Sequence, residues 1–165
     1  MEEARVLVNC TPSFPLTLFS ADVPPPPLPD APERSGIRRA GSQLRVLVVD
    51  DEPLIATTVT AILNDSGFEA IHAFSAEDAL VAARDFCPDV VLSDVLMPRM
   101  SGVDLGMRLR QELPGAYIIL FSGQAATTEL LRKARLDGYD FELLAKPIHP
   151  EELIVHLAAL KLPRS

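Results

Sequence analysis

The sequence contains no tryptophan, and aromatic residues make up only 5% of its 165 residues. Hydrophobic residues nevertheless account for 48%, so a buried core must consist mainly of leucine, valine, isoleucine and alanine. A chain of this length predicts one domain with an appendage. Glycine-rich nucleotide-binding motifs are absent, which argues against an ATPase or a dehydrogenase.

Long apolar runs and a basic surface are also missing. No apolar run approaches the ~20 residues of a membrane span, and the acidic start followed by Pro12 and Pro15 argues against a signal peptide. A net charge of −8 disfavours nucleic-acid binding. Cys10 and Cys87 have no metal-binding or redox spacing and are expected to be unpaired thiols. We therefore predict a cytoplasmic protein that binds neither nucleic acid nor membrane.

Residues 1–43 differ from the rest of the chain, because eight of the fifteen prolines lie there, four of them at 24–27. Such a composition favours extended backbone and cannot build a packed core. We expect a disordered N-terminal extension. The alternatives are a docking segment for a proline-recognising module and an over-long start of the reading frame.

From residue 44 onward, short apolar runs alternate with helical patterns. The runs are typical of strands buried on both faces, and therefore of a parallel sheet. Five strand-then-helix units in about 120 residues predict a doubly wound α/β sandwich. The predicted strands are 44–49, 69–74, 89–93, 116–121 and 140–145, and the helices follow Pro53, Ser75, Gly102, about residue 125 and Pro150.

Four of these strands are followed by polar residues at their carboxyl ends, and in an open parallel sheet the ligand site lies outside those ends. The residues are Asp50 with Asp51, then Asp94, Ser122 and Lys146. Adjacent carboxylates repel one another unless a cation is near, and oxygen ligands suit Mg²⁺. Asp94 can be a nucleophile that accepts a phosphoryl group, because a carboxylate forms an acyl phosphate. The Lys146 ammonium and the Ser122 hydroxyl can contact the phosphoryl oxygens.

The chain from about 43 to 162 resembles the receiver domain of bacterial two-component response regulators. The resemblance rests on the ordered segments VLVVDDEP (46–53), SDVLMPRMSG (93–102), Ser122-Gly123 and Lys146-Pro147. It implies a receiver domain over 44–162 with a flavodoxin-like three-layer sandwich, whose five parallel strands follow the order 2-1-3-4-5.

The resemblance also implies roles for individual residues. Asp94 is the phosphoacceptor for a sensor histidine kinase or a phosphotransfer protein. Mg²⁺ or Mn²⁺ is held directly by Asp51, Asp94 and the Leu96 backbone carbonyl, and through water by Asp50. Ser122 and Lys146 bind the phosphoryl group and act as the switch.

The sequence departs from the family pattern near the last strand. Receivers usually carry Tyr or Phe three residues before the lysine, where this chain has Leu143. Leu143 and Phe141 are the candidates for signal relay, and a plain core role for Phe141 is an equal alternative. Leu96 and Gln124 are expected to border the site and to tune hydrolysis of the phosphoryl group.

We therefore expect a stand-alone phosphorylatable switch, without an output domain, that acts on an unknown downstream protein or passes the phosphoryl group on. It is not an enzyme beyond its own phosphorylation and dephosphorylation. The first alternative is a degenerate receiver that binds partners without phosphorylation. The second is a Mg²⁺-dependent phosphatase of the haloacid dehalogenase type, which the order of the motifs disfavours.

Overall fold

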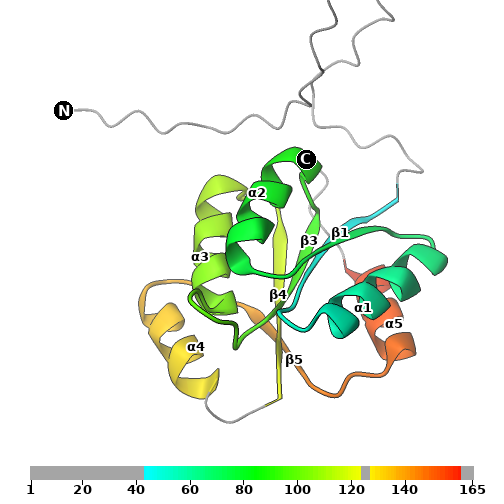
Figure 1. The fold of residues 1–165 in the computed structure, drawn as a ribbon. Coiled ribbons are helices and arrows are strands. Elements are labelled where there is room, and N and C mark those ends of the chain that lie inside the picture. The colour runs from blue at the N-terminus through cyan, green and yellow to red at the C-terminus, as the bar shows by residue number, and fades with distance from the viewer. Residues whose placement is uncertain (1–42, 124–126, 161–165) are drawn as a thin grey trace, which may run out of the picture.

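The computed structural model describes residues 43–123 and 127–160. Five strands alternate with five helices in this part of the chain (Figure 1). In chain order they are β1 (Arg45–Val49), α1 (Pro53–Asp65), β2 (Glu69–Ala73), α2 (Ala76–Phe86), β3 (Val90–Asp94), α3 (Gly102–Glu112), β4 (Tyr117–Ser122), α4 (Thr127–Leu136), β5 (Glu142–Ala145) and α5 (Pro150–Ala159). The predicted extension over 1–43 and residue Gln124 lie outside the described residues, apart from Gln43.

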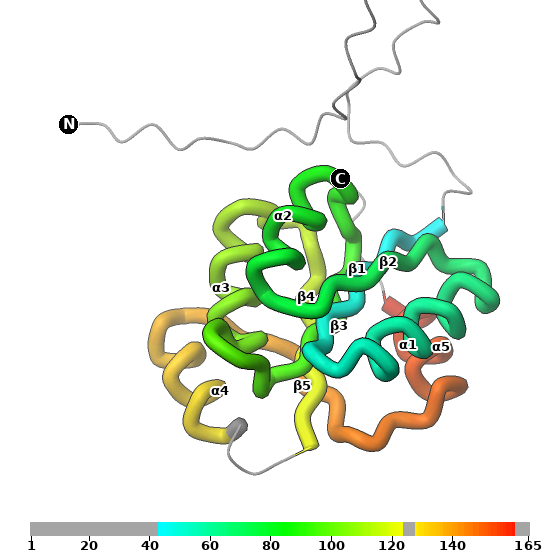
Figure 2. The backbone as a smooth tube through the Cα atoms, in the orientation of Figure 1, coloured from blue at the N-terminus to red at the C-terminus, as the bar shows by residue number. Residues whose placement is uncertain are grey.

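The strands form one parallel sheet in the order β2-β1-β3-β4-β5. The predicted doubly wound, flavodoxin-like fold is therefore confirmed. Helices α2, α3 and α4 cover one face of the sheet, and α1 and α5 lie side by side over the other (Figures 1 and 2). None of the helices described is both long and apolar enough to span a membrane.

Small differences from the predicted strand bounds matter for the site. Asp94 and Ser122 are the last residues of β3 and β4 rather than the first residues after them. Asp94 pairs with Phe121, and Ser122 pairs with Ala145. The sheet ladder therefore fixes the backbone of both residues.

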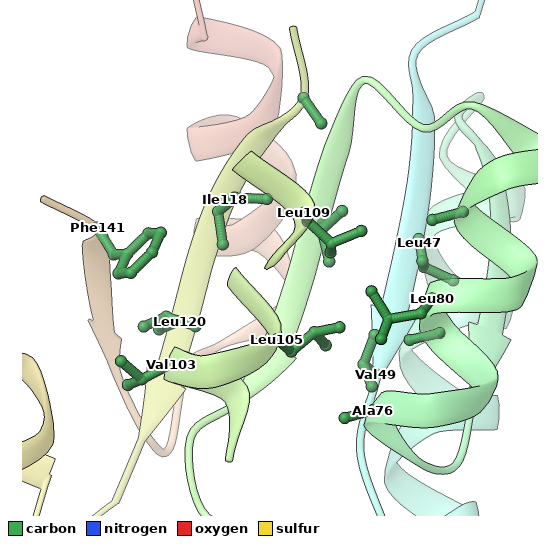
Figure 3. Close-up of a cluster of buried hydrophobic side chains, with 14 of the residues drawn as sticks. Leu47, Val49, Ala76, Leu80, Val103, Leu105, Leu109, Ile118, Leu120 and Phe141 are labelled. Carbon is green, nitrogen blue, oxygen red and sulfur yellow. The ribbon is translucent and has the colours of Figure 1, made fainter. Parts of the chain in front are cut away.

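The larger of the two buried clusters lies between the sheet and helices α2, α3 and α4 (Figure 3). It consists almost wholly of aliphatic side chains, as the scarcity of aromatic residues requires. Phe141 is the exception: it is buried beside Ile118 (Figure 3). A Cβ atom added to Gly106 of α3 would lie 3.1 Å from the Phe141 ring, so the glycine leaves room for that ring.

One expectation about the cysteines is wrong. No free cysteine occurs in the described part of the chain, so Cys87 is not an unpaired thiol. Cys10 lies outside the described residues.

Candidate phosphorylation site

The carboxyl ends of β1, β3 and β5 bring two carboxylates and one ammonium together. Asp50 directly follows β1 and its side chain is only 5% exposed. Lys146 directly follows β5, and its Nζ lies 2.9 Å from Asp50 Oδ2 and 2.9 Å from Asp94 Oδ1. Residues 96 positions apart in the chain thus meet at one edge of the sheet, as parallel topology predicts.

The two carboxylates keep Lys146 charged. Burial, the largest single influence, lowers the pKa of Lys146. Hydrogen bonds and charge interactions with Asp50 and Asp94 outweigh it, so the pKa of Lys146 is raised above its ordinary value. The ammonium therefore offsets the repulsion between two carboxylates that the fold holds close together.

Backbone hydrogen bonds hold these side chains in place. The Lys146 N–H donates to the Ser122 carbonyl at 2.8 Å, which joins the ends of β4 and β5. The Lys146–Pro147 peptide bond is cis. Asp50 Oδ1 accepts a hydrogen bond of 3.0 Å from the Glu52 N–H, so both oxygens of this carboxylate have partners.

Gly102 is a site residue that sequence reasoning did not single out. It begins α3, which Ser101 caps by accepting a hydrogen bond from the Asp104 N–H. The Gly102 N–H donates to the Val95 carbonyl at 3.0 Å, and a Cβ atom on Gly102 would overlap the Asp94 carbonyl oxygen. The close approach of α3 to Asp94 therefore requires glycine. The only sequence signal was its place in the SDVLMPRMSG segment.

The other site residues predicted from the sequence differ in how far they are exposed. Asp51 is exposed, whereas Asp50 is buried. Leu96 is 44% exposed and Leu143 is also 44% exposed. Phe141 is buried and stacks on Tyr139 with ring centres 6.1 Å apart. The structure thus gathers Asp50, Asp94 and Lys146, and it places Leu143 at the surface and Phe141 in the core.

The oxygen donors near Asp94 suit a hard divalent cation in type. Asp50 and Asp94 already share one cation, the Lys146 ammonium, which shows that this edge attracts positive charge. Within residues 43–123 and 127–160, however, no three acidic, histidine or cysteine side chains stand in a metal-binding arrangement. The donor types match the predicted cation, but in the arrangement shown the two carboxylates share the Lys146 ammonium instead.

Comparison with known proteins identifies the family of this chain. A family model described as the response regulator receiver domain matches residues 46–158. The chain is 38% identical over 125 residues to the probable transcriptional regulatory protein TcrX of Mycobacterium tuberculosis, covering 75% of this chain and 53% of TcrX. It is 32% identical to the DNA-binding response regulator MtrA of Mycolicibacterium smegmatis, covering 70% of this chain and 49% of MtrA.

Solved structures give the same result for the fold. A CheY-like response regulator receiver domain protein from Methanospirillum hungatei superposes with a TM-score of 0.64 at 27% identity, covering 71% of this chain and 92% of that one. The chain spans about half the length of the curated relatives it matches. Because MtrA is named as DNA-binding, the expectation that this protein binds no nucleic acid is not confirmed.

Proposed function

We propose that this protein is a phosphorylation switch. The chain belongs to the response regulator receiver domain family of two-component systems, and the proposal rests on that membership. In this proposal Asp94 accepts a phosphoryl group from a sensor histidine kinase or a phosphotransfer protein. The observation that carries it is the Lys146 ammonium, 2.9 Å from both Asp50 and Asp94. That geometry provides a nucleophile beside a fixed positive charge.

The transfer is a displacement at phosphorus. A bond forms between an Asp94 carboxylate oxygen and phosphorus, while the bond from phosphorus to the donor's histidine nitrogen breaks and leaves its electron pair on that nitrogen. Lys146 then releases Asp94 Oδ1 and contacts a phosphoryl oxygen instead. The Ser122 hydroxyl, at the end of β4, hydrogen-bonds another oxygen. Hydrolysis of the acyl phosphate returns the switch to its starting state.

The proposal includes a divalent cation. Asp50, Asp51, Asp94 and the Leu96 carbonyl are the oxygen donors that would hold Mg²⁺ or Mn²⁺. A bound cation supplies positive charge that neutralises the phosphoryl oxygens. With three negative carboxylates and an incoming phosphoryl group, one ammonium leaves net negative charge, and this is the reason we expect a cation requirement.

Signal output is proposed to be a protein contact or onward transfer of the phosphoryl group. Leu143 and Phe141 stay candidates for relay. Leu143 is exposed and can change its contacts directly, whereas Phe141 is buried and its ring lies close to Gly106 of α3. Tuning of hydrolysis by Leu96 and Gln124, and a cytoplasmic location, also stay predictions.

Beryllofluoride, a stable mimic of the phosphoryl group, tests the proposed site. Added with Mg²⁺, it should shift the backbone amide resonances of Asp94, Ser122 and Lys146. Arg45 and Glu69, at the opposite end of the sheet, should not shift. Beryllofluoride without Mg²⁺ should change none of these resonances. An absence of shifts at all three site residues in folded protein with Mg²⁺ contradicts the proposal and favours a degenerate receiver.

A further inference from the structure

An apolar groove lies beside the phosphorylation site, between α1 and the segment that leads into α5. Ile55, Val59 and Ile62 of α1 form one wall, and Ile148 and Leu153 form the other. The cavity volume is about 420 Å³, and among the described residues Lys146 is the only charged one that lines it. The α1 and α5 helices that flank it are neighbours in Figure 2. A groove of this kind offers almost no hydrogen-bond partners to whatever binds it.

This lining restricts the chemistry of the occupant. A buried backbone N–H without a partner is costly, so a segment that enters the groove should carry few N–H groups. Proline has none. A run of prolines also adopts an extended helix without internal hydrogen bonds and loses little conformational freedom on binding. The chain contains such a segment at 23–29, Val-Pro-Pro-Pro-Pro-Leu-Pro, which has no charged residue.

This segment joins the domain on the correct face. It precedes β1, and Leu44 packs in the same hydrophobic cluster as Val59, Ile148 and Leu153, which line the groove. The β1 strand is about 17 Å long at 3.3 Å per residue, and α1 is about 20 Å long at 1.5 Å per residue. The fourteen residues 30–43, extended at about 3.1 Å each, span up to about 43 Å. The proline segment can therefore reach the groove of its own molecule.

We propose that residues 23–29 bind intramolecularly in the groove between α1 and α5. Bound there, the segment covers the Pro147 side of the phosphorylation site and lies against Lys146. The N-terminal extension is then a ligand of the chain's own domain.

The test uses the full chain and the methyl NMR signals of its isoleucines. Two charges are introduced into the segment by the double substitution Pro26→Asp and Leu28→Asp, because an almost wholly apolar groove does not accept them. The signals of Ile55, Ile62 and Ile148 should then shift. The signal of Ile118, buried on the opposite face of the sheet, should stay in place. The matched control is Ser13→Asp with Ser20→Asp, which adds the same charge outside the segment and should leave all four signals unchanged.

Three results overturn the proposal. The first is that the methyl signals of Ile55, Ile62 and Ile148 do not shift in the double variant. The second is that they shift by the same amount in the Ser13→Asp/Ser20→Asp control. The third is wild-type groove signals that change on tenfold dilution, because a second copy of the chain would then occupy the groove. If the groove signals do not shift in the double variant but shift when a phosphodonor protein is added, the groove binds that donor instead. This outcome is a case of the first result.

Discussion

Replacing Lys146 with methionine is expected to lower the free energy of unfolding by about 1–3 kcal/mol in the absence of divalent cations. The substitution leaves the Asp50 carboxylate 5% exposed and without its cation, close to a second carboxylate on Asp94. Removing one partner of a buried ion pair is costly because the other charge stays buried. Lys146 is itself 27% exposed, which keeps the loss below that of a fully buried pair.

The measurement is urea unfolding with and without millimolar Mg²⁺. The cation should stabilise the Lys146→Met variant more than the wild type, since it can replace the lost positive charge. Lys133→Met, at an exposed position on α4, is the matched control and should cost little. A Lys146→Met variant as stable as wild type in both conditions would show that the Lys146 ammonium does not offset the carboxylates.

Gly102→Ala is expected to have the other large effect. The added Cβ would overlap the Asp94 carbonyl oxygen and lie 2.8 Å from Ser93 Oγ. Backbone atoms must therefore move. We expect a net loss of about 2–3 kcal/mol, because the backbone must move to make room for the methyl group. Because the displaced atom belongs to Asp94, the rate of phosphorylation should also fall.

Gly106→Ala in the same helix is the comparison for Gly102→Ala. Its Cβ would meet the far edge of the Phe141 ring at 3.1 Å, and a ring edge can move by a few tenths of an ångström. Urea unfolding should therefore show a clearly smaller loss for Gly106→Ala. Equal stability of the two variants would mean that the backbone at Asp94 yields to an added methyl group as easily as the edge of the Phe141 ring does.

The fold could be predicted because its signals are local. Each strand is a short apolar run followed by a helical pattern, and parallel topology then brings Asp50, Asp94 and Lys146 to one edge. The ends of β3 and β4 were each predicted one residue short. Polar residues such as Asp94 and Ser122 are typical of loops, but the ladder with the neighbouring strand extends through them.

The parts that could not be predicted depend on side chains that are distant in sequence. Nothing in the Asp50-Asp51 pair indicates that Asp50 is buried against Lys146 while Asp51 is exposed. The fit of Phe141 against Gly106 depends on how α3 packs on the sheet. The apolar groove likewise exists only once Val59 of α1 faces Leu153 of α5. The burial of Asp50, the fit of Phe141 and the shape of the groove all depend on how separate helices and strands pack together. The sequence pattern within one element does not determine them.

Intact-mass spectrometry after incubation with acetyl phosphate tests the central claim most directly. Wild type in the presence of Mg²⁺ should gain the mass of a single phosphoryl group, and it should gain nothing when the cation is removed. Asp94→Asn should stay folded and gain nothing in either condition. An adduct that persists in Asp94→Asn, or that forms equally well without Mg²⁺, would contradict Asp94 as the phosphoacceptor at a cation-dependent site.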